Sequence, residues 1–139
     1  MLRAPLSELS IILVGDRRMS LLHERFMNEP GPTDVLTFPI DLDARGRPLS
    51  GEVYVCVTEA RRQGKALGTP LAHEILLYAL HGMLHLCGFD DRTEVEHRRM
   101  HRIEDRLLTR LGIGPVYRRT KQGRKVTRLN RRSSISSTP

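Results

Sequence analysis

The chain has 139 residues, of which 39% are hydrophobic and 28% are charged, and its formal net charge at pH 7 is +7. This length favours one modest core, and the longest apolar run near the start, residues 11–14, is far too short to span a bilayer. No signal peptide is visible, and Cys56 and Cys87 lie inside apolar runs rather than at metal-ligand spacing. These features argue against a membrane or secreted protein and predict reduced, buried thiols in a cytoplasmic one.

The first half of the chain predicts three strands and one helix. Residues 9–14 are mostly apolar and rich in branched side chains, which is typical of a buried strand. A helix is expected at about residues 17–28, where a Pro-Gly-Pro sequence ends it. Residues 35–40 predict a second strand, and the alternation of Val with other residues over 52–57 predicts a third, half-buried one.

A short helix and a long central helix follow. Thr58 can cap the short helix, which is expected to end near Gly68. Thr69 followed by a proline is the strongest helix start in the sequence, with Thr69 as the N-cap. The helix predicted over residues 70–87 is apolar nearly all round, so we expect it to be central and buried.

The last predicted helix begins with a capping box formed by Thr93 and Glu96 and ends at Gly112. It carries two histidines four residues apart, His97 and His101. Their neighbours include three arginines, whose positive charge opposes a metal ion, so a solvated polar face is favoured. His97 remains a possible substitute ligand because it follows closely after the motif described next.

The central helix ends in the sequence HGMLHLCGFDD, which begins at His81. On a helix, His81 and His85 lie roughly 6 Å apart along the axis and on one side, so both rings can hold one ion. Gly88 is placed for a left-handed helix stop, and the turn can bring Asp90 or Asp91 back to the two rings.

Two imidazole nitrogens, one carboxylate oxygen and a water molecule form the ligand set of a catalytic zinc. The alternative is a buried helix end whose imidazoles are simply hydrogen-bonded. Glu74 shares a stripe of the helix with the histidines but lies roughly 10 Å along the axis from His81. We therefore expect Glu74 to reach solvent or to support a ligand from behind.

The motif HGMLHLCGFDD resembles the signature H-G-x-L-H-L-x-G-Y-D-H of the YbeY family of rRNA maturation endoribonucleases. A second segment, PTDVLTFP at residues 32–39, resembles the T-D-V-L-S-F-P strand of that family, and Gly51-Glu52-Val53 is similar to its G-D-I. The three segments occur in the family's order, and the resemblance covers most of residues 9–112.

The resemblance implies a metal site formed by His81, His85 and Asp91, with one Zn²⁺ per chain. The order of predicted elements gives an α+β fold, a small mixed sheet packed on helices with the metal site at the end of the central helix. The resemblance adds that this fold is zincin-like. It also implies a further strand and helix before residue 9, so the domain expected over residues 1–116 has a shorter N-terminus than is usual in the family.

Two positions depart from the family pattern. Asp91 stands where the third metal-binding histidine is expected, and Met27 occupies the position of an arginine that the family links to activity. Arg25 is the nearest substitute for that arginine and is therefore the catalytic candidate.

The resemblance implies a single-strand-specific, metal-dependent endoribonuclease acting in 16S rRNA 3′-end maturation and ribosome quality control, with rRNA, the small ribosomal subunit and ribosomal proteins as partners. One alternative is a ribosome-assembly factor that binds metal and RNA with little cleavage. Another is a zinc metalloprotease, because the spacing of the motif also fits H-E-x-x-H-x-x-G-x-x-H/D. In that pattern the Glu is the general base, whereas here the position holds Gly82, which cannot move a proton.

The positive charge is concentrated near the end of the chain. Residues 118–132 contain eight Lys and Arg and no acidic residue, which leaves a net charge of −1 on the rest of the chain. Residues 117–139 lack apolar periodicity and are expected to be disordered. Such a tail can neutralise RNA phosphates without selecting sequence, although it can also be an uninvolved solubilising segment. The candidate RNA-binding residues are Arg118, Arg119, Lys121, Arg124, Lys125, Arg128, Arg131 and Arg132.

Overall fold

A computed structural model of the chain describes residues 4–89 and 92–113. This part of the chain forms three strands and four helices, and none of these helices is long and apolar enough to cross a membrane. The elements in chain order are β1 (Glu8–Val14), α1 (Asp16–Met27), β2 (Val35–Pro39), β3 (Ser50–Cys56), α2 (Val57–Leu67), α3 (Leu71–Leu86) and α4 (Glu94–Arg110).

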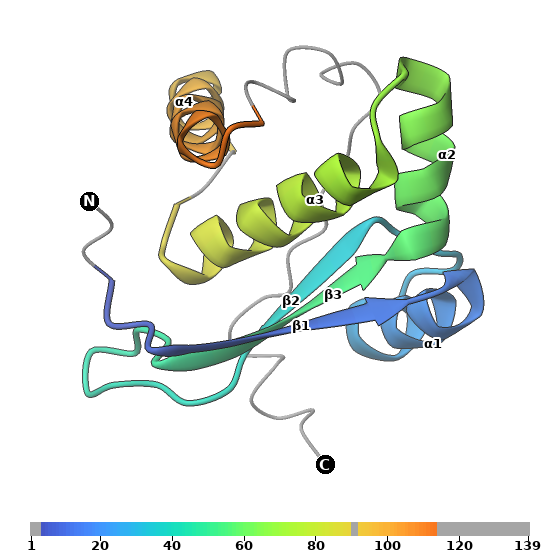
Figure 1. The fold of residues 1–139 in the computed structure, drawn as a ribbon. Coiled ribbons are helices and arrows are strands. Elements are labelled where there is room, and N and C mark those ends of the chain that lie inside the picture. The colour runs from blue at the N-terminus through green and yellow to red at the C-terminus, as the bar shows by residue number, and fades with distance from the viewer. Residues whose placement is uncertain (1–3, 90–91, 114–139) are drawn as a thin grey trace.

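The three strands form one mixed sheet in the order β1-β3-β2. Strand β1 runs parallel to the central strand β3, and β2 runs antiparallel to β3. Helix α3 crosses one face of this sheet, α1 covers part of the other face, and α4 lies on the side of α3 away from the sheet (Figure 1). The predicted α+β class and the small mixed sheet packed on helices are therefore confirmed.

The alternation of side chains along β2 and β3 divides the core between the two faces of the sheet. Val53 and Val55 of β3 point to α3, where they pack with Tyr78. Phe38 and the half-buried Tyr54 point to α1, and their rings meet edge to face at 5.4 Å. The sheet therefore separates an α3 side from an α1 side.

Helix α4 closes the α3 side. The predicted capping box is present, because Thr93 accepts from the backbone N–H of Glu96 while the Glu96 side chain accepts from the backbone N–H of Thr93. Leu108 is fully buried against Leu77 and Leu80 of α3. The last helix therefore covers the core on the α3 side.

The predicted start of the central helix is wrong by one residue. Pro70, not Thr69, is the N-cap of α3, because the Pro70 carbonyl accepts the first helical bonds, from His73 and Glu74. Thr69 instead belongs to the turn after α2, where its N–H donates to the Gly64 carbonyl at 2.9 Å. Its buried hydroxyl makes no hydrogen bond among the described residues.

The predicted start of the short helix is also displaced. Cys56 is the N-cap of α2 and Val57 is its first residue, so Thr58 lies inside the helix. The other end agrees with the prediction, since Gly68 adopts the left-handed conformation, with a φ of 71°. Cys56 is buried, as expected, whereas Cys87 is only partly buried, and both cysteines are free.

Gly82 lets α3 lie directly on the sheet. A Cβ atom at this position would lie 2.7 Å from Val53 Cγ1 and 2.9 Å from Thr37 Cγ2. Both neighbours are β-branched and stiff, so neither methyl can move aside without a change of rotamer or backbone. The absence of a side chain at Gly82 therefore sets the distance between α3 and the sheet.

We expect Gly82→Ala to destabilise the protein by about 1 to 3 kcal/mol, because the added methyl overpacks the contact with the sheet. In an exposed helix the same change would stabilise by roughly 1 kcal/mol, so the sign of the effect is informative. The measurement is denaturant unfolding of chelator-treated protein.

Ala72→Gly, at an exposed position in the first turn of the same helix, reports the effect of helix propensity alone and is expected to lower stability by at most roughly 1 kcal/mol. A Gly82→Ala variant more stable than the wild type would contradict the close contact.

Candidate metal centre

The two motif histidines meet at the C-terminal end of α3. His81 and His85 have exposed fractions of only 3% and 4%, and their Nε2 atoms lie 3.1 Å apart. The rings are edge to face, with centroids 4.7 Å apart. The spacing of four residues therefore brings both imidazoles together, as predicted.

This geometry fits a metal ion. In a tetrahedral zinc site with Zn–N distances of about 2.0 to 2.1 Å, two nitrogen ligands lie roughly 3.3 Å apart. The observed 3.1 Å between the two Nε2 atoms is close to that separation. The same distance also suits one N–H···N hydrogen bond, so the pair can share either an ion or a proton.

Helix α4 supplies a carboxylate to this pair. Glu104 is fully buried, and its Oε2 atom makes a short contact with His81 Nδ1. Its other oxygen, Oε1, lies 2.6 Å from Nδ1 of His101, which is also buried. Burial by itself would raise the pKa of Glu104, but the hydrogen bonds with His101 and His81 hold that pKa below its usual range.

The prediction of a solvated polar face is wrong for His101. Its side of α4 faces α3, because His101, Glu104 and the fully buried Leu108 follow one another at helical spacing. The three neighbouring arginines that suggested exposure are themselves exposed and lie on the other sides of the helix. Ring contact extends the cluster to His97, whose centroid is 4.3 Å from that of His101.

His81, His101 and Glu104 each offer a ligand atom within 4.8 Å of the others, so this buried cluster could itself hold a metal ion. Glu104 was not predicted from the sequence. The sequence pattern could have predicted its burial, because Glu104 lies at helical spacing from Leu108 and interrupts an apolar stripe of the helix. An acidic residue in such a place needs a partner.

Other predicted residues are placed as follows. Gly88 has a φ of 97°, and the chain turns back there with Phe89 N–H donating to the Leu84 carbonyl, so the predicted left-handed stop is present. Glu74 is fully buried rather than solvated. Asp91, with Asp90, lies outside the described residues, and so do the eight cations of the tail.

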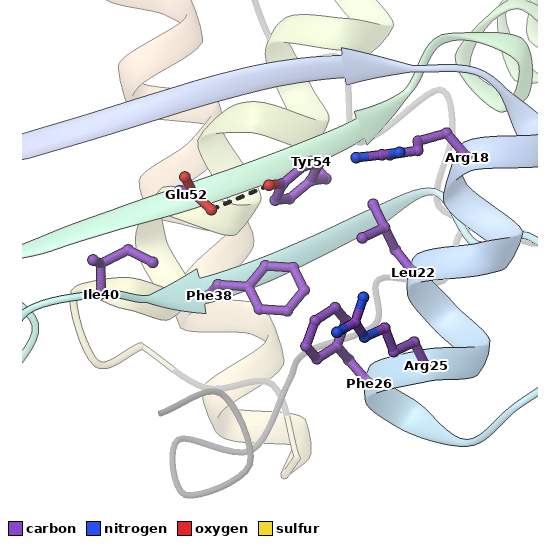
Figure 2. A pocket seen from close by; sticks show the side chains of 8 residues that line it. All are labelled: Arg18, Leu22, Arg25, Phe26, Phe38, Ile40, Glu52 and Tyr54. Atoms are coloured by element: carbon purple, nitrogen blue, oxygen red, sulfur yellow. Dashed lines mark hydrogen bonds between the residues drawn. The ribbon is translucent and has the colours of Figure 1, made fainter. Parts of the chain in front are cut away.

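Arg25 lies on the other side of the sheet from the histidines. It belongs to α1 and lines a hollow of about 180 Å³ between that helix and strands β2 and β3 (Figure 2). The guanidinium lies 5.4 Å from the centre of the Phe26 ring. The structure therefore does not bring Arg25 to the metal centre.

The remaining residues of this hollow come from both walls. Arg18, Leu22 and Phe26 of α1 face Phe38, Ile40, Glu52 and Tyr54 (Figure 2). The Tyr54 hydroxyl donates to Glu52 across 3.1 Å.

The chain is similar to known proteins in sequence and in fold. A family model described as endoribonuclease YbeY matches residues 2–112. The chain is 44% identical over 111 residues to endoribonuclease YbeY of Thermobifida fusca, an alignment that covers 75% of this chain and 72% of the relative. It is 38% identical over 136 residues to endoribonuclease YbeY of Mycobacterium tuberculosis, covering 90% and 77%. The solution structure of TM1509 from Thermotoga maritima superposes with a TM-score of 0.53 at 26% identity, covering 75% of this chain and 70% of that one.

Proposed function

We propose, for a chain that belongs to the endoribonuclease YbeY family, that it is a metal-dependent endoribonuclease specific for single-stranded RNA. Its substrate is the 3′ end of 16S rRNA, during maturation and quality control of the small ribosomal subunit in the cytoplasm. Ribosomal proteins are further partners. The observation that carries the proposal is the buried pair of Nε2 atoms of His81 and His85, 3.1 Å apart, in a chain whose relatives are named endoribonucleases.

The proposed ligands are His81, His85 and Asp91, and the proposed metal is one Zn²⁺ per chain. Two imidazoles and one carboxylate match a catalytic zinc site, which keeps a position open. When bound, the ion would polarise a phosphate oxygen of the RNA and lower the pKa of a water molecule. His81 and His85 supply lone pairs from rings that are almost completely buried.

RNA carries its charge along the backbone, so cations must hold it. The eight Lys and Arg of residues 118–132 are proposed to neutralise phosphates without selecting sequence. Gly82 has no group that can transfer a proton, which argues against the zinc protease alternative.

A second candidate function is a ribosome-assembly factor that binds metal and RNA but cuts poorly. It is favoured by Met27, which stands where the family resemblance expects an arginine linked to activity. Met27 is partly buried and packs with the fully buried Met19 and Leu36 on the α1 side of the sheet. A thioether in that position cannot stabilise negative charge on a phosphate.

For the ligand set, we expect His81→Ala and His85→Ala to lose stoichiometric zinc, measured by elemental analysis after dialysis. His73→Ala is the matched control, because His73 is a partly exposed histidine of the same helix, and it is expected to keep the metal.

Asp91→Ala is expected to weaken zinc binding, whereas Asp91→His keeps it, because imidazole and carboxylate both bind zinc at about 2.0 to 2.2 Å. Loss of zinc from Asp90→Ala but not from Asp91→Ala would show that Asp90, and not Asp91, is the third ligand.

For the reaction, we expect the zinc-loaded protein to cut single-stranded RNA, to stop when a chelator removes the metal, and to resume when zinc is restored. Duplex RNA and casein serve as the comparison substrates and are expected to remain intact. His85→Ala is the metal-free control. Stoichiometric zinc without RNA cleavage would favour the assembly factor, and casein cleavage would favour the protease.

For the tail, we expect deletion of residues 118–139 to weaken binding to every single-stranded RNA by a similar factor. The slope of log affinity against log salt should flatten by roughly 0.7 for each phosphate that the shortened protein no longer neutralises. Deletion of residues 133–139, which contain no Lys or Arg, is the matched control and should leave the slope unchanged. Equal slopes for wild type and the longer deletion would exclude the tail as a phosphate-binding segment.

A further inference from the structure

Glu104 is the one described residue whose carboxylate engages two imidazoles at once, one of them on the metal-binding helix α3. Its Oε2 atom contacts His81 Nδ1, and its Oε1 atom lies 2.6 Å from His101 Nδ1. This carboxylate comes from α4, outside both α3 and the motif HGMLHLCGFDD.

We infer that Glu104 is a positioning residue of the metal centre, which acts through His81. A neutral imidazole carries one N–H, and a carboxylate can only accept. When Nδ1–H of His81 donates to Glu104, the lone pair of that ring is on Nε2, the atom that lies 3.1 Å from Nε2 of His85. The carboxylate thus selects the tautomer and ring orientation in which His81 can bind a metal ion together with His85.

His101 has a different part in this arrangement. It lies one turn before Glu104 on α4 and engages the second carboxylate oxygen. With each oxygen held by one ring, the carboxylate cannot rotate away from His81 without breaking the contact with His101. The rings of His81 and His101 are also stacked, with their centroids 5.8 Å apart and an interplanar angle of 29°.

Contacts near both ends of α4 fix the position of Glu104 relative to α3. The Thr93 and Glu96 capping box sets where α4 begins. One turn beyond Glu104, Leu108 is fully buried against α3. A slip of α4 along α3 would therefore cost buried apolar contacts as well as the hydrogen bond between Glu104 and His81.

A purely structural ion pair is the competing explanation. It predicts that a Glu104 variant loses stability but that, once folded, it binds zinc as tightly as the wild type. A positioning residue predicts weaker zinc binding by the folded variant. Removal of such a carboxylate partner from a ligand histidine typically weakens metal binding about 10-fold to 100-fold.

The test is a competitive chelator titration of Zn²⁺ with the full-length protein. We expect Glu104→Gln to weaken zinc binding about 10-fold to 100-fold, because the amide removes the negative charge behind His81. Glu94→Gln, at an exposed position in the first turn of the same helix, is the matched control and should bind as the wild type does. A folded Glu104→Gln variant with unchanged zinc affinity overturns the inference.

A second measurement needs no variant. In metal-free wild type at a pH where imidazole is neutral, ¹⁵N NMR should show His81 protonated at Nδ1 and unprotonated at Nε2. The opposite tautomer overturns the inference even if Glu104→Gln does not fold.

The inference rests on the proposed metal site. The His85→Ala variant tells a failure of the ligand assignment apart from a failure of the role of Glu104. If His85→Ala loses zinc while Glu104→Gln keeps it, the ligand assignment stands and the role of Glu104 is wrong. If His85→Ala keeps zinc, the ligand assignment itself has failed, and the inference falls with it.

Discussion

The close approach of α3 to the sheet is the constraint on which the rest of the structure depends. Two glycines permit it from opposite sides. Gly82 of the helix meets Val53 and Thr37, and a Cβ at Gly51 of β3 would lie only 2.6 Å from Leu86 Cδ1. These contacts join all three segments that carry the family resemblance, residues 32–39, 51–53 and 81–91. The three segments therefore form one packed interface. With one side of α3 pressed on the sheet, His81 must face α4.

That placement buries the polar His81 and His85 rings, and α4 supplies a hydrogen-bond partner for His81. Two imidazoles nearly closed to water need partners, because a buried polar group without one costs on the order of 1 to 3 kcal/mol. Glu104 meets His81, yet a fully buried carboxylate is itself costly unless its oxygens are engaged. His101 takes the second oxygen, so a chain of contacts runs from His101 through Glu104 to His81. A metal ion at the other end of this chain would gain a ligand already oriented for it.

The sequence predicted the fold well where local physics decides it. Side-chain patterns, caps and helix stops predicted every described strand and helix to within two residues at most boundaries, and the Thr93 capping box was correct. The prediction of a buried first strand was wrong, because Ile11 and Leu13 of β1 are exposed. Prediction failed where the tertiary packing decides. Thr69 has the right chemistry for an N-cap, but its backbone is held by Gly64 in the preceding turn. His101 is flanked by arginines in sequence, and only the docking of α4 on α3 reveals that its own side of the helix is buried. The zincin likeness, the role of Asp91 and the tail are still predictions, because they depend on residues or comparisons beyond the described contacts.

Holding a metal ion and cutting RNA place different demands on this chain. The first demand is local, and α3 and α4 meet it with residues that contact one another directly: His81, His85 and Glu104. The second requires a group that stabilises charge on the phosphate, and the arginine that the family resemblance leads one to expect is replaced by Met27, packed in the core of the α1 side. Arg25 is two residues away but on a different side of the sheet from the histidines. Arg25 therefore does not supply charge beside the histidines in this arrangement.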